Sequence, residues 1–401
     1  MSKPLTPGQA TEVIRARLTS LPPETRSIRE CLGGVLRQTV MAERDNPPFD
    51  RVCMDGAAVS SQAFVDGARH FTLQGTQAAG AVPLVLDSAA SAIEIMTGAV
   101  LPPGTDCVIP LEEYELADGR ITLNSDATAE PWRNIQRRGS DSSPDVPMLL
   151  EGVRLGAAEV AVLASAGLAR ARVSRQPRIR VISTGDELVE PGLPIADHQI
   201  RRSNAYAVVA ALQAHRYHHV EDDHLQDDPA LMRQRLGEHL AHNDVLVLSG
   251  GVSKGKFDYV PDTLKQLGVE EVFYQVAQRP GRPMWFGVGP QGQAVFGLPG
   301  NPVSTLICLL RYVIPALDVM TAALKLGCER VALAAPVGPR RMTYFMPVKL
   351  VRDAQSPGLA MPHAPSGSGD FLALAGTDGF VELPPSPEGY PEGFLADFYR
   401  W

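Results

Sequence analysis

Residues 245–259 read VLVLSGGVSKGKFDY, and this stretch decides the predicted fold. Its apolar beginning is typical of a buried parallel strand, and Ser249, Gly250 and Gly251 follow as a tight loop. Because glycine has no Cβ, backbone N–H groups in such a loop can approach an anion closely. Open α/β sheets bind ligands at loops of this kind, at the carboxyl ends of their strands. Taken alone, the stretch is a weak signal, and an ordinary strand-to-helix turn explains it more often than a ligand loop does.

The length and composition of the chain limit the class of protein. A chain of 401 residues predicts about two to four domains, and 44% hydrophobic with 20% charged residues is typical of a globular protein. A net charge of −8 argues against nucleic acid as a partner. The five cysteines have no CxxC spacing, which favours free thiols in a reducing compartment. We find no signal-peptide core and no apolar run near the ~20 residues of a membrane span, and therefore expect a cytoplasmic protein without membrane contact.

Residues 177–320 alternate between strand and helix patterns. This alternation predicts a three-layer αβα domain with a mainly parallel sheet. Three loops in this part of the chain each follow a predicted strand: TGDE, SGGVSKGKFD and LPGNP. Because the carboxyl ends of parallel strands meet at one edge, we expect the three loops to border one ligand site. The expected strands are 178–183, 245–248, 271–275 and 294–297. The expected helices are one capped by Ser203 and Asn204, and those at 230–241, 261–267 and 303–317.

Charged side chains accompany these loops. Several carboxylates would repel an anionic substrate unless a cation stood between them, and oxygen ligands of this type suit Mg²⁺ that holds phosphate. The basic side chains and glycine N–H groups would bind the oxyanions. Each carboxylate taken singly is also compatible with a surface position. The charged residues are Asp186, Glu187, Asp227, Asp258, Lys254, Lys256, Arg279 and Arg282.

Residues 46–139 contain short β-type runs separated by Gly, Pro and Asp, which predicts a small β-rich domain. It would interrupt a helical domain formed by residues 1–45 and 140–176. Within it, Asp55 and Thr97 are each followed directly by glycine. Both of these dipeptides are also typical of turns. Arg137 and Arg138 suit an oxyanion through their fork geometry, although such pairs are as common on exposed surfaces.

A histidine-rich segment is a competing candidate for a metal site. His215, His218, His219 and His224 lie close in sequence to two aspartates, Asp222 and Asp223. No helical geometry fixes these side chains as a ligand set, so we predict a solvated polar loop.

Eight motifs occur in the order seen in one protein family. They are NPPFD (46–50), MDG (54–56), IMTGAVLPPGTDCVIPLEE (95–113), NIQRRGSD (134–141), ISTGDEL (182–188), SGGVSKGKFDY (249–259), RPGRP (279–283) and LPGNPVS (298–304). In these motifs the chain resembles the molybdopterin molybdenumtransferases, the MoeA family that includes the gephyrin E domain. The resemblance covers nearly the whole chain.

The resemblance implies an enzyme that takes adenylylated molybdopterin and molybdate, releases AMP and inserts molybdenum to form molybdenum cofactor. It implies an elongated homodimer of α/β multidomain chains. Each chain would have the discontinuous helical domain I, the β-rich insertion as domain II, the αβα molybdopterin-binding domain III at 177–320, and a small C-terminal β-barrel, domain IV, at 327–401. Molybdopterin adenylyltransferase and molybdoenzyme apoproteins, or their chaperones, would be partners.

The resemblance also implies roles for individual residues, with the active site shared between subunits. One chain would supply Asp55, Thr97 and Asp141, and the other chain the domain III residues. The catalytic set is Asp55, Asp141, Glu187, Asp227 and Asp258, and the metal ligands are Asp186, Glu187, Asp227 and Asp258. The substrate-binding set is Thr97, Gly98, Arg137, Arg138, Ser249, Gly250, Gly251, Ser253, Arg279, Arg282, Pro299, Gly300, Asn301 and Ser368.

The chain departs from the family pattern at several positions. Ala57 follows MDG, where the family usually has tyrosine, and Arg279 and Arg282 stand where it usually has lysine. Arginine can still bind an oxyanion with two hydrogen bonds, but it does not donate a proton. Lys254 and Lys256 are additional charges. Two alternatives therefore remain: a molybdopterin adenylyltransferase, which shares TGDEL, SGGVS and LPGNP, and a non-catalytic gephyrin-like scaffold or degenerate paralogue.

Overall fold

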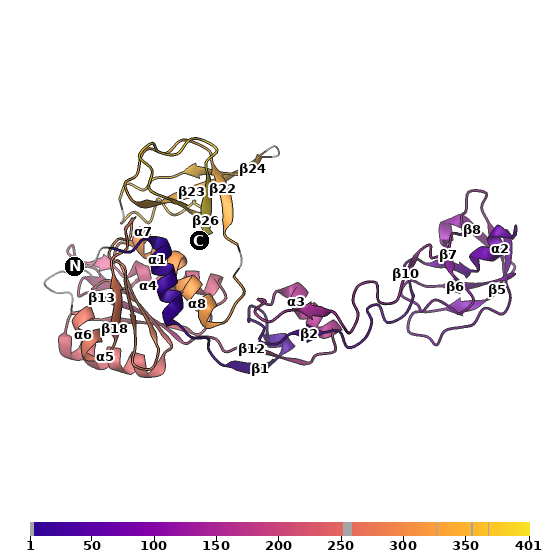
Figure 1. The fold of residues 1–401 in the computed structure, drawn as a ribbon, viewed down its shortest axis with the longest axis horizontal. Helices are drawn as coiled ribbons and strands as arrows, with labels where there is room; N and C mark the ends of the chain where they lie inside the picture. Colours follow the sequence, from indigo (N-terminus) through magenta and orange to yellow (C-terminus); the bar gives the residue numbers. More distant parts are fainter. Residues whose placement is uncertain (1–3, 252–258, 326, 354–355, 368) are drawn as a thin grey trace.

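The structure, a computed structural model, describes residues 4–251, 259–325, 327–353, 356–367 and 369–401. The predicted site residues Ser253, Asp258 and Ser368, together with Lys254 and Lys256, lie outside the described residues. Figure 1 shows an elongated chain, with an αβα unit and a β-barrel at one end and a β-rich domain at the other. A narrow middle part connects the two ends. The predicted fold class is therefore confirmed.

The αβα unit contains a six-stranded sheet with the order β16-β13-β17-β21-β20-β18. The first four strands are parallel, and β20 runs antiparallel to both of its neighbours, β21 and β18, which confirms the mainly parallel sheet. The strands are β13 (Ile179–Thr184), β16 (Val220–Leu225), β17 (Val245–Ser249), β18 (Glu270–Tyr274), β20 (Trp285–Val288) and β21 (Ala294–Leu298).

The apolar run of β17 is explained by burial on both faces of this sheet. Val245 and Val247 lie in one hydrophobic cluster, which α1, α4, α7 and α8 cover, whereas Leu246 and Leu248 lie in a second cluster, which α5 and α6 cover. A strand covered on both faces has no reason to alternate with polar residues. The helices are α1 (Pro7–Arg17), α4 (Ser203–Ala214), α5 (Pro229–His242), α6 (Val260–Gln266), α7 (Pro302–Cys308) and α8 (Ile314–Met320), with a π-helical turn at Leu309–Val313 between the last two.

The prediction of a solvated loop around the histidine-rich segment is wrong for Val220–Leu225, which forms the edge strand β16, whereas residues 215–219 lie in a turn and loop. The charges of this strand have partners on neighbouring elements. Asp223 Oδ2 lies 2.7 Å from Arg235 NH2 and 2.6 Å from His239 Nε2, and Asp222 pairs with Arg202. Charged residues suit an edge strand, since they discourage pairing with another chain. Sequence pattern missed the strand because it lacks an apolar run.

The expectation that no apolar run approaches the length of a membrane span is wrong. The continuous helical stretch Pro302–Met320 is such a run. Its 19 residues are long and apolar enough to cross a membrane, with a mean hydropathy of 1.7. However, 72% of this stretch is buried inside the protein, where Val303, Ile307 and Leu317 belong to the hydrophobic cluster on one face of the sheet. It is therefore a core helix.

Domain II contains a six-stranded sheet with the order β7-β4-β6-β5-β9-β8. This sheet confirms the β-rich character predicted for this part of the chain. Its strands are β4 (Gly56–Val59), β5 (His70–Gln77), β6 (Ser91–Ile95), β7 (Cys107–Pro110), β8 (Tyr114–Ala117) and β9 (Arg120–Leu123), with the short helix α2 (Ser61–Val65) beside them.

The middle part of the chain consists of two-stranded ribbons and one helix. β1 (Pro23–Ser27) pairs with β12 (Arg170–Ser174), and β2 (Val40–Met41) pairs with β11 (Pro147–Leu149). Helix α3 (Ala157–Ser165) packs beside them, whereas α1, which the sequence assigns to domain I, packs against α8 of the αβα unit. The residue boundaries of the four domains stay predictions.

The C-terminal residues form a closed β-barrel with the order β23-β24-β22-β26-β25, closed by pairing of β25 with β23. Its strands are β22 (Glu329–Leu333), β23 (Thr343–Asp353), β24 (Ser356–Pro362), β25 (Gly379–Leu383) and β26 (Leu395–Arg400). The short strand β19 (Gln278–Arg279) of the αβα unit adds to β23, so the two units are joined by backbone pairing.

A buried ion pair also joins the barrel to the αβα unit. Arg311, in the π-helical turn and 9% exposed, donates from Nε to Glu382 Oε2 at 2.7 Å and from NH1 to Thr11 Oγ1 at 2.7 Å. Tyr399 donates to the same Glu382 oxygen at 3.0 Å. The side chain of Glu382 is 18% exposed, so water screens this pair weakly.

We expect Glu382→Ala to destabilise the protein by about 3 kcal/mol, because it leaves the Arg311 charge buried without a carboxylate. Chemical denaturation monitored by fluorescence measures this change. Glu329→Ala is the matched control in the same barrel: Glu329 pairs with Arg400 at 3.4 Å, and both side chains are about half exposed. We expect that variant to change stability by less than about 1 kcal/mol. Equal effects of the two variants would contradict the prediction.

Candidate active site

The described parts of the three predicted loops lie together at the carboxyl edge of the parallel sheet, because β13, β17 and β21 are adjacent. Gly250 and Gly251 have φ angles of +93° and +65°, a region that favours glycine. A Cβ on Gly251 would lie 2.6 Å from Thr184 Oγ1, at the end of β13. A larger residue would therefore push the two loops apart. The close packing of the loops at this edge of the sheet requires glycine here.

Asn204, in the first turn of α4, connects two of these loops. Its Nδ2 donates to Ser249 Oγ at 2.9 Å and to the Gly300 carbonyl oxygen at 2.7 Å. A Cβ on Gly300 would lie 3.6 Å from the Gly250 Cα, so the loops are in contact. The sequence suggested a helix cap at Asn204; α4 in fact begins at Ser203, and the Asn204 side chain binds the loops instead.

Only some of the predicted carboxylates lie close together at the sheet edge. The backbone N–H of Asp227 donates to Asp186 Oδ1 at 3.1 Å, and both residues line one open depression beside α5. Asp228, their neighbour, caps α5 by accepting from the N–H groups of Ala230 and Leu231. Glu187 is exposed near the same loop. The described part of the chain contains no group of three or more His, Cys, Asp or Glu side chains able to hold a metal ion, and Asp258 lies outside that part.

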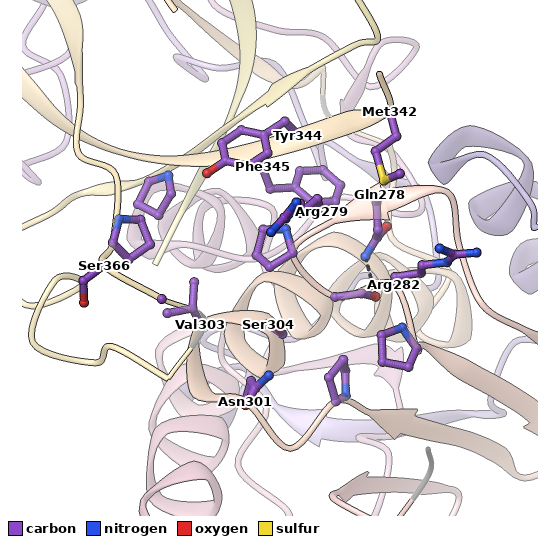
Figure 2. Close-up of a pocket in the computed structure, with 17 residues that line it drawn as sticks. Gln278, Arg279, Arg282, Asn301, Val303, Ser304, Met342, Tyr344, Phe345 and Ser366 are labelled. Carbon is purple, nitrogen blue, oxygen red and sulfur yellow. Dashed lines mark hydrogen bonds between the residues drawn. The ribbon is translucent and has the colours of Figure 1, made fainter. Parts of the chain in front are cut away.

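A cavity of about 490 Å³ lies between the αβα unit and the barrel. Its size falls within the range of small-molecule sites. Figure 2 shows side chains from the RPGRP loop, the LPGNP loop and the barrel around it. The predicted residues Arg279, Arg282, Pro299 and Asn301 all line it, together with Ser366 of the turn that precedes Ser368. Residues that the sequence analysis missed also line it: Gln278, Val303, Ser304, Met342, Tyr344 and Phe345.

The two arginines give this cavity its charge. Both are exposed, and the described residues offer neither of them an ion-pair partner, although the structure records many other arginine pairs. Arg279 extends toward Tyr344 and Phe345, and Arg282 extends to the other side of the loop (Figure 2). Two uncompensated guanidinium groups on one loop favour an anionic ligand.

The LPGNP loop lies between the cavity and the glycine loop. Gly300 lies against Gly250 at the sheet edge, whereas its neighbours Pro299 and Asn301 line the cavity. Asn301 precedes α7 as its N-cap residue but makes no capping hydrogen bond with its side chain. Thr305 Oγ1 donates to the Pro299 carbonyl oxygen at 2.6 Å, which holds this loop on α7.

At the other end of the chain, Asp55 and Thr97 meet beside β4. Asp55 Oδ1 accepts from the Thr97 backbone N–H at 2.6 Å and from Thr97 Oγ1 at 2.8 Å. These bonds, the backbone one first, lower the pKa of Asp55 below its ordinary value of 3.8. The adjacent Gly98 has φ +85° and donates to the Val52 carbonyl oxygen at 2.8 Å. Asp55 is therefore an exposed anion at neutral pH.

The remaining predicted residues of this end follow strand β10 (Ile135–Gln136), which pairs with β3 (Arg51–Val52). Asp141 Oδ1 accepts from Gln136 Nε2 at 2.7 Å. Arg137 stacks over the Trp132 ring at 4.0 Å, and Arg138 donates from Nε to Asp45 Oδ2 at 2.6 Å. Arg138 is thus partly neutralised by a carboxylate, whereas Arg137 is held by an aromatic face and keeps its charge for a ligand.

We expect Thr97→Val to raise the pKa of Asp55 toward 3.8, because it removes the hydroxyl donor and keeps the backbone donor. The folded-state pKa lies below the unfolded one, so this effect stabilises the fold above about pH 4 and is lost as pH falls further. NMR titration of the Asp55 carboxyl carbon measures the shift. Thr97→Ser, which keeps the donor, should leave the pKa unchanged; a valine variant with an unchanged pKa would refute the assignment.

One chain does not bring the two ends together. The sheet of domain II lies at the far end of the molecule from the αβα unit (Figure 1). Asp55 and Thr97 therefore cannot reach the loops of the sheet edge within the same chain in this conformation.

The chain is a multidomain protein with a probable molybdopterin binding domain. Three family models match the chain: the MoeA N-terminal region (domain I and II) at residues 5–167, a probable molybdopterin binding domain at 180–319, and the MoeA C-terminal region (domain IV) at 330–401.

Relatives agree with these matches. A molybdopterin molybdenumtransferase from Synechocystis is 38% identical over 393 residues, which cover 98% of both chains. A crystal structure of a molybdopterin biosynthesis MoeA protein from Pyrococcus horikoshii is 30% identical, covers 99% of both chains and has a TM-score of 0.77. A second from the same organism, 23% identical over the whole of both chains, shares the fold with a TM-score of 0.81. The chain belongs to the molybdopterin molybdenumtransferase family, and the resemblance found in its motifs is confirmed.

Proposed function

We propose that this protein is a transferase that inserts molybdenum from molybdate into adenylylated molybdopterin and releases AMP, so forming molybdenum cofactor. Membership of the family supports the reaction class. The observation that carries the proposal in this chain is the region made by the cavity with Arg279 and Arg282, the LPGNP loop beside it and the glycine loop. One end of this region suits a tetrahedral oxyanion and the other suits phosphate.

Different residues of this region have different roles in the proposed reaction. Gly250 and Gly251 allow the backbone to approach the phosphates of the adenylylated substrate, and Asn204 holds that loop against Gly300. Arg279 and Arg282 bind molybdate. Water cleaves the bond between AMP and the molybdopterin phosphate, and the carboxylates at the sheet edge orient that water and receive its proton. Ser253, Asp258 and Ser368 are proposed for the same region from the family motifs.

Mg²⁺ is the proposed cofactor, and it would need substrate phosphates as ligands, because the described residues contain no group of three or more side chains able to hold it. This ion keeps several waters and often uses one or two carboxylates together with substrate phosphates. Asp186 and Asp227 line one open depression and are linked by a hydrogen bond from backbone to carboxylate, so they would hold it together with Asp258 and Glu187. When bound, Mg²⁺ would neutralise the phosphate charge.

We further propose a homodimer in which domain II of one chain faces the αβα unit of the other. The separation of the two ends within a chain supports this arrangement, because Asp55, Thr97, Gly98, Arg137 and Asp141 would otherwise have no substrate to contact. Since all five cysteines are unpaired, the reducing cytoplasm is the proposed compartment. Molybdopterin adenylyltransferase would supply the substrate, and molybdoenzyme apoproteins or their chaperones would receive the product.

The alternatives are less well supported. An adenylyltransferase would need only the αβα unit, whereas the family match extends over both flanking regions. A non-catalytic scaffold would not need uncompensated arginines in a cavity. The deciding experiment mixes the purified protein with adenylylated molybdopterin, Mg²⁺ and molybdate and follows AMP release and cofactor formation. Absence of AMP would reject the proposal, and ATP consumption with free molybdopterin would favour the adenylyltransferase.

A further inference from the structure

Gln278 is a buried polar residue with no role in the function proposed above. It directly precedes Arg279, and its side chain is fully buried, with 0% exposure, behind the loop that carries both arginines. Its backbone belongs to β19, which pairs with β23 of the barrel. Burial of an amide is costly unless its groups are hydrogen-bonded, so the partners of Gln278 show what the side chain does.

The Gln278 amide is held in one orientation. Its Nε2 donates to the Gly281 carbonyl oxygen at 3.0 Å, shown as a dashed line in Figure 2, and to Cys308 Sγ at 3.4 Å. Its Oε1 accepts from the Tyr312 hydroxyl. Since only the amide oxygen can accept and only the nitrogen can donate, the tyrosine keeps Nε2 directed at Gly281.

Gly281 lies between the two arginines and directly precedes Arg282. It has φ +87°, and a Cβ there would lie 2.7 Å from Cys308 Sγ and 2.9 Å from Gln278 Nε2. The turn is therefore packed directly on the buried amide and thiol. Any displacement of Gln278 would move the backbone that carries Arg279 and Arg282.

Tyr312 is suited to this role as a donor. Burial raises its pKa well above the ordinary value, so its hydroxyl stays protonated at every working pH. Burial likewise raises the pKa of Cys308 to about 12, which keeps that group a neutral thiol. Tyr312 lies in the same π-helical turn as Arg311, whose ion pair with Glu382 anchors the barrel wall of the cavity. Such turns place neighbouring side chains differently from an α-helix and often occur at functional sites.

We propose that Gln278 and Tyr312 are positioning residues that hold the Arg279–Arg282 turn in the geometry that receives a tetrahedral oxyanion. They act through the Gly281 carbonyl oxygen. This inference rests on the proposed function, because molybdate is the oxyanion in question. It adds a prediction of its own: loss of the amide affects molybdate binding and leaves the binding of adenylylated molybdopterin unchanged.

Gln278→Met tests the inference, because methionine keeps the approximate shape and removes all three hydrogen bonds of the amide. We expect the KM for molybdate to rise about tenfold while kcat stays within about twofold, the pattern of lost uniform binding. Gln293→Met is the matched control: Gln293 is a buried glutamine of the same unit, 6% exposed, that donates to the Leu240 carbonyl oxygen at 2.9 Å. It should lower Tm similarly and leave the KM unchanged. An unchanged KM in Gln278→Met, or an equal rise in both variants, overturns the inference.

A double-mutant cycle tests whether Tyr312 acts through Gln278. Tyr312→Phe removes only the hydroxyl and should raise the KM for molybdate about threefold, but it should add nothing in the Gln278→Met background. Additive effects would separate the two residues and reject the connection. Hydrogen exchange of the Arg282 amide should also be faster in both single variants. If the wild-type protein releases no AMP, the proposed function fails. If it releases AMP but the variants leave the KM for molybdate unchanged, only the positioning role fails.

Discussion

Replacement of both Arg279 and Arg282 by alanine is expected to lower kcat/KM for molybdate about a thousandfold. Each arginine lines the cavity without an ion-pair partner among the described residues, so an oxyanion gains the full charge-assisted interaction. A hydrogen bond to a charged group contributes about 1.5–3 kcal/mol, and two such groups amount to about 4 kcal/mol, or roughly three powers of ten. Initial rates of cofactor formation at varied molybdate measure this loss.

The lysine pair is the control for this prediction. Arg279→Lys with Arg282→Lys keeps both charges and restores the residues usual in the family, so we expect it to retain activity within about tenfold of the wild type. The alanine pair should keep its affinity for adenylylated molybdopterin, because the glycine loop lies at the other end of the region. An alanine pair with an unchanged KM for molybdate would remove the cavity from the proposed mechanism.

Two inactive variants are expected to restore activity when their subunits are mixed. Asp55→Ala damages the domain II end, and the alanine pair at Arg279 and Arg282 damages the αβα end of a different chain. If each site is built from both chains, a mixed dimer contains one intact site and one doubly damaged site. Random exchange makes half of the dimers mixed, so activity should reach about a quarter of the wild-type value.

The measurement is cofactor formation after the two purified variants are unfolded, mixed and refolded together, with each variant refolded alone as the control. A site confined to one chain predicts a different result, since every chain in the mixture then carries damage and activity stays at the level of the single variants. The β-rich domain and the αβα unit lie at opposite ends of the molecule in Figure 1, and this separation favours restoration of activity in the mixture. Asp55→Asn is a milder form of the same test, because it keeps the shape that accepts from Thr97 and removes the charge.

The sheet and most of its loops could be predicted from local pattern. β17 is apolar throughout because both faces of the sheet are covered, and that pattern is visible in the sequence. The glycines that follow it are required by the approach of Thr184, which also leaves a local trace. β16 could not be found in this way, because its charges are balanced by Arg202, Arg235 and His239 from other elements.

The candidate site was predictable to a smaller extent. Motifs identified Arg279, Arg282, Pro299 and Asn301, and the structure places all of them around one cavity. The same motifs could not show that Tyr344 and Phe345 of the barrel form the opposite wall, because this depends on the pairing of β19 with β23. Arg138 was predicted as a ligand residue, yet in the structure its guanidinium group is paired with Asp45.

The sequence by itself determined the family, the order of the domains' motifs and the identity of the loops at the sheet edge. These features depend on residues close in the chain, such as an apolar run followed by glycines. Only the tertiary structure decided how the loops are supported. Gln278 and Tyr312 are 34 residues apart and meet only when α7 and its π-helical turn pack behind the RPGRP loop. Likewise, only the folded chain places Asp55 far from the sheet edge, because that distance depends on the length of the middle part and not on any local pattern.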